Sequence, residues 1–396
     1  MPLCRCLLVA SLGLAVVSFP LETRAEEAAK KVRFERKQLD AKFRSEGVAV
    51  GDFNQDGKPD IAAGFVWYAA PDWKMHQITE TAPEYNPKGY SNSFCNFAED
   101  VNNDGWMDLL VVDFPGTPTW WFENPKETGK LWPKHTVTPV TNNESPTYLD
   151  LDGDGKRELI MGFSPDPKNT DGPEKRIGYA KPTTNPNEPW TVHAVSAKNA
   201  PGANRYSHGL GVGDVNGDGK NDVLIADGWW EAPATKSEEE WTFHPAKFGQ
   251  AAQMFAYDFD GDGDNDVLSS SPHAYGIWWH EQVGKNEWKT HEIDKTFSQT
   301  HGVCMADING DKLPDFVTGK RWWAHASGDP GVNEPAVFFW FELTRENGRP
   351  TWIPHQFDHD SGPGTQFELA DVSGDGLLDI VSSNKKGVYL FTQVRD

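Results

Sequence analysis

The chain has 396 residues, with 59 acidic side chains against 37 basic ones and a formal net charge of −22 at pH 7. This acidic balance argues against nucleic acids and anionic membrane surfaces as partners. The 17 Trp and 22 Phe stand beside 37 Gly and 28 Pro, a mixture typical of many short strands and turns and not of long helices.

Residues 1–25, MPLCRCLLVASLGLAVVSFPLETRA, combine a basic residue, an apolar stretch and a small-residue end. This pattern predicts a secretory signal peptide that is cleaved after Ala25, and the segment is too short for a convincing membrane span. An uncleaved anchor is the alternative. No other segment has the character of a membrane span, so we expect residues 26–396 to be secreted or periplasmic.

One nine-residue acidic pattern recurs along the rest of the chain. It reads DFNQDGKPD, DVNNDGWMD, DLDGDGKRE, DVNGDGKND, DFDGDGDND, DINGDKLPD and DVSGDGLLD. The seven copies begin 44 to 64 residues apart, and a period near fifty indicates a propeller or solenoid array.

Expected strands flank each copy. Apolar runs such as GVAVG and VLIA lie on either side, and an aromatic run such as TWWFE and a W-x-x-H strand follow. Four strands per unit are the make-up of a propeller blade. The seventh unit lacks its fourth strand, and FERKQLD at residues 34–40 can supply it and close the ring. We therefore predict an all-β, seven-bladed propeller formed by residues 26–396 as one domain.

The acidic pattern places side-chain oxygens at positions 1, 3, 5 and 9, with a backbone carbonyl available at position 7. Oxygen ligands on a tight loop suit Ca²⁺. An EF-hand is excluded because position 12 carries residues such as Ala63 and Val111 in place of Glu. An Asx-turn hairpin without metal is the alternative. The predicted calcium ligands are Asp52, Asn54, Asp56 and Asp60; Asp100, Asn102, Asp104 and Asp108; Asp150, Asp152, Asp154 and Glu158; Asp214, Asn216, Asp218 and Asp222; Asp258, Asp260, Asp262 and Asp266; Asp307, Asn309, Asp311 and Asp315; and Asp371, Ser373, Asp375 and Asp379.

With GVGDVNGDGKNDVLIA and its six relatives, the chain resembles the FG-GAP/VCBS repeats, which are the calcium-loop blades of integrin-type propellers. The resemblance covers nearly all of residues 26–396. It implies a propeller fold with structural calcium in several blades, and it implies little about function.

Departures from the repeat point to a site at the channel mouth opposite the acidic loops. About six strand residues separate each loop from that mouth, which is roughly 20 Å. At this level the fourth to sixth units carry RYSHGLG, SSSPHAYG and SQTHG. His208, His273 and His301 could converge there, and three imidazoles with an open position suit Zn²⁺ or another divalent ion. The alternative is that each is a polar residue hydrogen-bonded at a strand end.

Other polar and aromatic residues of the same stretches offer acid–base groups and flat faces for sugar rings. We predict that the catalytic residues are His208, His273, His301, Lys320, Tyr275, Asp227 and Glu144, and that the substrate-binding residues are Arg321, Trp230, Tyr206 and Asp113.

The stretches HGLGVGDVNGDG, PHAYGIWWHEQ, QTHGVCMADING and VTGKRWWAH resemble the propeller portion of the aldos-2-ulose dehydratase/isomerase family. That family removes water from anhydro-keto-sugars with a divalent metal at the propeller site. The resemblance implies that the three histidines are metal or substrate ligands, and that Lys320, Arg321 and Tyr275 contact the substrate.

The leading hypothesis is a secreted, calcium-stabilised propeller that eliminates water or an alcohol from a keto-sugar. A base, which could be Asp227, Glu144 or a histidine, removes the proton next to the carbonyl while metal and cationic groups stabilise the enolate. One alternative is a non-catalytic propeller that binds a glycan or a protein. A long-chain polysaccharide lyase is disfavoured because no long basic groove is evident. The sequence leaves the oligomeric state open.

Overall fold

The computed structural model describes residues 31–185, 187–234, 241–325 and 328–395. The predicted signal peptide lies outside these ranges. The described residues form strands joined by turns and loops and contain no α-helix. Among them there is accordingly no helix long and apolar enough to cross a membrane.

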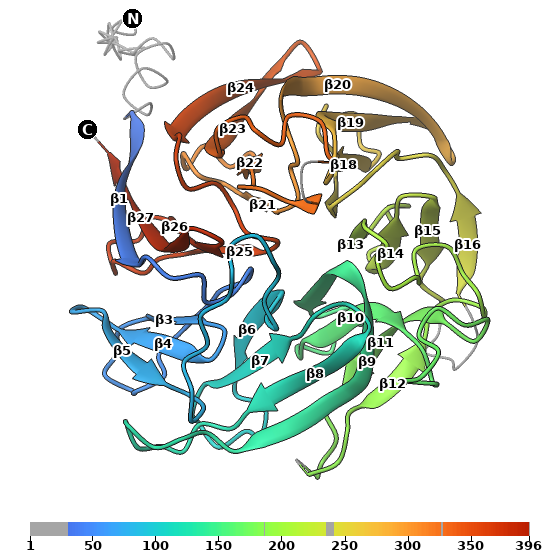
Figure 1. Ribbon diagram of the computed structural model, residues 1–396. Coiled ribbons are helices and arrows are strands. Elements are labelled where there is room, and N and C mark those ends of the chain that lie inside the picture. Colours follow the sequence, from blue (N-terminus) through green and yellow to red (C-terminus); the bar gives the residue numbers. More distant parts are fainter. Residues whose placement is uncertain (1–30, 186, 235–240, 326–327, 396) are drawn as a thin grey trace, which may run out of the picture.

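The strands pair into successive antiparallel groups that follow one another around a ring (Figure 1). The first groups are β2 (Ala49–Gly51), β3 (Asp60–Ala63), β4 (Val66–Ala69) and β5 (Lys74–Gln77); then β6 (Cys95–Glu99), β7 (Asp108–Val112), β8 (Thr117–Phe122) and the first half of β9 (Lys134–Leu149); and then the second half of β9 with β10 (Glu158–Phe163), β11 (Arg176–Lys181) and β12 (Thr191–Ala194).

The later groups repeat this order. They are β13 (Leu210–Gly213), β14 (Asp222–Ile225), β15 (Gly228–Glu231) and β16 (Thr242–Pro245); β17 (Gln253–Tyr257), β18 (Asp266–Ser270), β19 (Tyr275–Gly284) and β20 (Glu287–Ser298); β21 (Val303–Ala306), β22 (Asp315–Lys320), β23 (Val337–Glu346) and β24 (Arg349–Asp358); and β25 (Phe367–Ala370), β26 (Asp379–Asn384) and β27 (Gly387–Arg395), completed by β1 (Val32–Asp40). We interpret each group as one blade, so the count of seven blades is our interpretation of this pairing.

The first and last strands of the described chain pair with each other. β1 lies antiparallel to β27, with Phe34 opposite Gln393 and Val32 opposite Arg395. The N-terminal strand therefore joins the last sheet, where the sequence places residues 34–40. This pairing covers an edge of that sheet, which would otherwise expose unpaired backbone groups.

The hydrophobic core lies between adjacent sheets. One cluster joins Trp67 of β4 to Phe122 of β8, and another joins Trp230 of β15 to Ile160 of β10. Further clusters continue in the same way around the ring and return to the first sheet, where Tyr68 packs with Val388. Because burial of a large apolar side chain stabilises a fold by about 1.5–3 kcal/mol, these layers supply most of the stability of the ring.

The W-x-x-H histidines belong to this scaffold. His135 stacks on Trp121 with ring centroids 4.3 Å apart, and His291 stacks on Trp279 at 4.4 Å. Each also contacts a carboxylate of the neighbouring strand: Nε2 of His135 lies 2.9 Å from Glu123. The same arrangement in other sheets gives these histidines a packing role.

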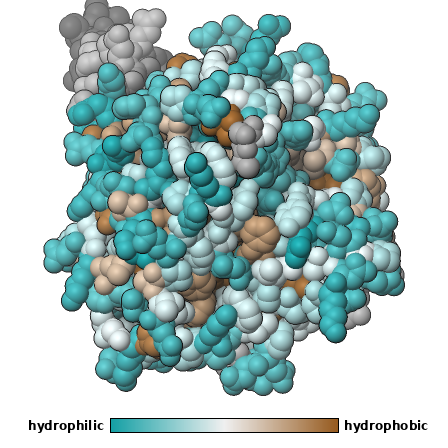
Figure 2. Space-filling view, viewed as in Figure 1, coloured by the Kyte–Doolittle hydropathy of each residue, from teal (hydrophilic) through white to brown (hydrophobic). Residues whose placement is uncertain are grey.

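The hydrophilic character of the surface agrees with the composition. In Figure 2 hydrophilic residues cover most of the visible face, and hydrophobic residues appear only as small, separated spots. No broad apolar patch is visible on this side.

Phe34→Ala should destabilise the protein by about 2 kcal/mol, because a half-buried ring is lost from the closing strand. The Phe34 ring lies 4.7 Å from that of Phe357, in the next sheet. Urea unfolding measures the change. Glu35→Ala, at an exposed position of the same strand, is the control and should cost less than about 0.5 kcal/mol. Equal effects of the two substitutions would contradict a closing role for β1.

Candidate functional site

The acidic loops are tight turns held by their first aspartate. In the loop that begins at Asp214, one carboxylate oxygen accepts hydrogen bonds from the amides of Gly217 and Asp218, at 2.8 and 3.0 Å. The other oxygen accepts from Gly219 at 2.8 Å. Gly219, with φ of +84°, has a left-handed backbone conformation that glycine adopts more easily than other residues.

The ninth residue of the pattern has a structural task of its own. Asp222 is fully buried, and its two carboxylate oxygens accept hydrogen bonds from the amides of Val215 and Ala232, at 2.9 and 2.8 Å. It thereby ties the loop to the end of β15. The equivalent Asp60, Asp108, Asp266 and Asp315 make the same pair of contacts.

The loops differ in how well their side chains fit a calcium ion. Ligand atoms of Asp258, Asp260 and Asp262 all lie within 4.8 Å of one another, and so do those of Asp150, Asp152 and Glu158; both are oxygen-rich sets of the kind that Ca²⁺ prefers. In the loop that begins at Asp150, the ammonium of Lys181 already contacts Asp152 at 2.6 Å and Glu158 at 3.1 Å. The loop at Asp258 therefore fits calcium better.

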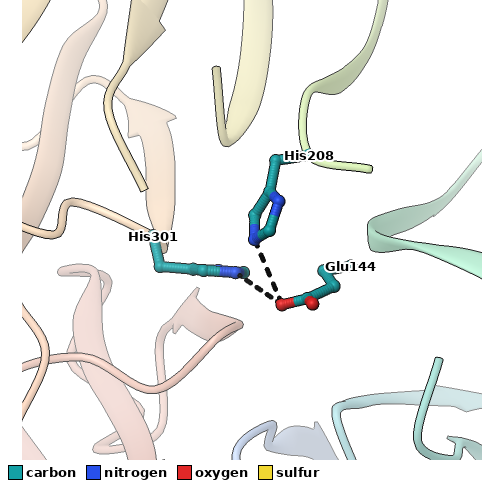
Figure 3. Close-up of side chains that lie close together, drawn as sticks. All are labelled: Glu144, His208 and His301. Atoms are coloured by element: carbon teal, nitrogen blue, oxygen red, sulfur yellow. Dashed lines mark ion pairs between the residues drawn. The ribbon is translucent and has the colours of Figure 1, made fainter. Parts of the chain in front are cut away.

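At the other end of the innermost strands, one carboxylate and three imidazoles converge (Figure 3 shows three of the four). Glu144 lies in β9, His208 precedes β13, His301 precedes β21, and His273 lies between β18 and β19. Glu144 Oε2 is 3.1 Å from His208 Nε2 and 3.4 Å from His301 Nε2. His208 Nε2 is also 3.1 Å from His273 Nε2.

These separations suit a metal centre. Ligands about 2.0–2.1 Å from a tetrahedrally coordinated ion stand roughly 3.4 Å from each other, and the distances of 3.1 and 3.4 Å between these atoms are similar. His301 is completely buried, and neither of its ring nitrogens has a hydrogen-bond partner. A buried imidazole without partners is costly, and a bound cation would satisfy it.

The charge states of these groups also suit a cation. Burial and the charge of Arg321 lower the pKa of His301 to about 3, and burial and the charge of His208 lower the pKa of His273 to about 4. Both imidazoles are therefore neutral at pH 7, with a lone pair to donate. Burial alone would raise the pKa of Glu144, but the adjacent imidazoles of His208 and His301 hold it well below its usual value.

A second group of polar side chains contacts His273 at its other ring nitrogen, Nδ1, and at its ring face. Asp329 accepts hydrogen bonds from Nδ1 of His273 at 3.1 Å and from Nε2 of Gln299 at 2.9 Å. With its Nδ1 anchored, His273 directs Nε2 towards His208. His325 stacks on His273 with centroids 4.4 Å apart, and its Nδ1 lies 3.2 Å from Asp329.

Two of the residues predicted for the site are buried. Lys320 is fully buried and donates through Nζ to the carbonyl of Arg321 at 3.2 Å. Trp230 is only 3 % exposed, because its ring belongs to the core between two sheets. Their contact with a substrate stays a prediction.

Four other predicted residues make no described side-chain contact with the histidine cluster. Tyr206 is 52 % exposed, and its ring centroid lies 6.0 Å from that of Phe114. Asp113 accepts a hydrogen bond from Asn92 at 2.8 Å, and Tyr275 donates one to Glu334 at 2.6 Å. Asp227 is exposed at the start of β15, and none of its described side-chain contacts involves the cluster.

The sequence analysis missed Lys385 and Asp329. Lys385 lies over the ring of Tyr90, with its Nζ 4.0 Å from the ring centroid. The same Nζ lies 3.8 Å from Glu46 Oε1. Two consecutive lysines, Lys385 and Lys386, directly follow the end of β26 at Asn384, and this pair of charges at a strand end could have pointed to Lys385. Asp329 lies in the long segment between β22 and β23, which has no counterpart in the repeat and gave no signal.

Comparisons with known proteins agree with the repeat. Residues 100–161 and 258–318 match the family described as FG-GAP-like repeat, and residues 46–65 match FG-GAP repeat. No protein with curated function matches the sequence. The chain is a β-propeller with FG-GAP repeats in these matched segments.

Solved structures resemble the chain at low identity. BBS1N, solved in complex with ARL6DN, is 9 % identical with a TM-score of 0.52, over 91 % of this chain and 96 % of that one. An Agrocybe aegerita lectin specific for non-reducing terminal N-acetylglucosamine is 13 % identical (TM-score 0.47, 91 % and 86 % covered). The rhamnogalacturonan lyase YesX is also 13 % identical (TM-score 0.46, 91 % and 72 % covered). The first of these likenesses supports the fold, and none of them shows the aldos-2-ulose resemblance, which stays a prediction.

We expect Asp258→Asn with Asp260→Asn to lower the calcium bound per chain by one ion, because two of three clustered carboxylates are neutralised. Equilibrium dialysis with elemental analysis measures the content. Chelation should lower the stability of the unsubstituted protein, since an ion at 100 times its Kd contributes about 2.7 kcal/mol.

Asp152→Asn is the matched control for this double substitution. Lys181 already contacts Asp152 and Glu158 in this loop, so the calcium content should stay unchanged. Protein that binds no calcium at millimolar concentrations would show that the acidic loops are hydrogen-bonded turns alone.

Proposed function

We propose that the chain is a metal-dependent carbohydrate lyase or dehydratase, and that its active site is the cluster of Glu144, His208, His273 and His301. The observation that supports this most directly is that ligand atoms of Glu144, His208 and His301, from three different sheets, lie within 4.8 Å of one another, with His273 Nε2 3.1 Å from His208 Nε2. The repeat histidines form no such cluster: each stacks on an aromatic ring, and four of the six also contact a glutamate. We also propose that residues 26–396 are secreted.

The donor set of nitrogen and oxygen atoms fits Zn²⁺ or a similar divalent ion. Glu144, His208 and His301 would hold the ion, with His273 as a fourth ligand or beside an open position. When bound there, the ion polarises the carbonyl of a keto-sugar and lowers the energy of the enolate.

The proton transfers fall to residues around the cluster. His325 is an exposed side chain whose Nδ1 contacts Asp329, so Nε2 is the nitrogen that can act as general base. It removes the proton from the carbon next to the carbonyl, and the C–H electrons form the enolate. As the C–C double bond forms, the C–O bond at the β carbon breaks, and the leaving oxygen takes from His325 Nε2 the proton that this nitrogen removed from carbon and departs as water or an alcohol.

The second candidate is a non-catalytic glycan-binding propeller. The rim of aromatic rings around the same mouth favours it: Tyr90 and Phe114 lie 5.8 Å apart, and Phe114 and Tyr206 lie 6.0 Å apart. Aromatic faces bind the apolar faces of sugar rings without any chemistry. This candidate needs neither a second metal nor His325.

His208→Ala with His301→Ala should remove the non-calcium divalent ion and reduce elimination at least 100-fold, because both imidazole ligands are lost. Metal analysis after mild chelation of calcium measures the first effect. Incubation with anhydro-keto-sugars, followed by ultraviolet absorbance of the enone product, measures the second.

The control is His355→Ala, a repeat histidine that stacks on Trp340 and contacts Glu342. It should keep both the ion and the activity, apart from a loss of stability. Calcium as the sole metal, unaffected by the double substitution, would overturn the metal site and favour the glycan-binding candidate.

A further inference from the structure

Arg321 is a buried cation beside the histidine cluster. It follows directly on β22 and is 5 % exposed. Its backbone amide donates to the carbonyl of Gln299 at 3.4 Å, and the side chain of Gln299 donates to Asp329, the partner of His273. Arg321 therefore lies beside the segment that carries His301.

The guanidinium has an unused edge. Its Nε and Nη2 have no hydrogen-bond partner in the protein and are shielded from solvent. These two nitrogens lie on the same side of the planar group, and their two parallel N–H bonds match the two oxygens of a carboxylate. Leaving such donors buried and unpaired is costly.

The acidic side chains nearby are already engaged elsewhere. Glu144 contacts His208 and His301. Glu46 accepts hydrogen bonds through Oε2 from the amide and hydroxyl of Ser91 and turns Oε1 towards Lys385. Among the described residues no carboxylate lies within 4.0 Å of the Arg321 guanidinium, although most buried arginines have such a partner.

Lys385 adds a second positive charge on this side of the mouth. It is 6 % exposed, and its Nζ donates to the carbonyl of Gly89 at 2.7 Å. The rings of Tyr90 and Trp323 lie over it at 4.0 and 5.1 Å. Glu46 balances Lys385, whereas the guanidinium of Arg321 has no acidic partner among the described residues.

We propose that the Nε/Nη2 edge of Arg321, with Lys385 beside it, binds the carboxylate of the substrate, and that the carbohydrate is therefore a sugar acid. This inference rests on the proposed function, because it names the ligand of the same site. Binding displaces the side chains that cover this edge. A carboxylate anchored there holds the sugar ring between the two cations and the histidine cluster.

Isothermal titration with matched pairs of sugars tests the inference. D-galacturonate, D-glucuronate and D-mannuronate are each compared with the neutral sugar that carries a hydroxymethyl group in place of the carboxylate. At least one acid should bind 10-fold or more tightly than its neutral partner. Arg321→Lys keeps the charge and loses the two-nitrogen edge, so it should remove most of that preference and leave neutral sugars unaffected.

Further variants and conditions separate the contributions. Lys385→Met should weaken binding of the acid several-fold, whereas Lys386→Met should not, because Lys386 pairs with Asp360 at the surface. Titrations are repeated after chelation, since a preference owed to a metal ion alone would vanish there while the Arg321 contribution remains. Unfolding curves show whether each variant is folded. If Arg321→Lys does not fold, the comparison of the acids with their neutral sugars on the unsubstituted protein still tests the inference.

The inference is overturned if none of the three acids is preferred over its neutral sugar, or if Arg321→Lys keeps the preference in full. Elimination from neutral keto-sugars can still be observed in that case, so the proposed function is judged separately. Conversely, binding of an acid that depends on Arg321, without any elimination, would support the inference and leave a binding propeller.

Discussion

Each sheet of this protein buries its faces against the sheets on either side, and this mutual burial fixes the ring. Trp67 of β4 packs on Phe122 of the next sheet, and Tyr68 of the same strand packs on Val388 of the last sheet. The innermost strands are thereby held around one axis with their ends at common levels. As a result, Glu144 and His301, more than a hundred positions apart in the sequence, meet at one point.

Repetition made the fold predictable and the site only partly so. Counting from the acidic loops placed Glu144, His208 and His301 at the same level, because every innermost strand has a similar length. It could not show that Trp230 points into the core, since the direction of a side chain near a strand end depends on local twist. Asp329 and His325 lie in a segment that no other unit shares, so their convergence on His273 required the three-dimensional structure.

Two kinds of histidine illustrate how environment separates scaffold from site. His291 stacks on Trp279 and contacts Glu281 at 2.6 Å, so its ring is satisfied by its own blade. His301 belongs to no such arrangement: it is fully buried, without hydrogen bonds, and faces groups from other sheets. Residue type is the same in both cases. What distinguishes them is whether the protein itself completes their bonding.

The pairing of β1 with β27 also sets an order on folding. Phe34 is among the first residues of the described chain to emerge during synthesis, yet its partner Gln393 is among the last. The ring thus stays open until β27 is present, and contacts so distant in sequence form slowly. A truncated chain would keep two exposed sheet edges and be exposed to proteases and to aggregation. Closure of the ring therefore requires that both β1 and β27 have been synthesised.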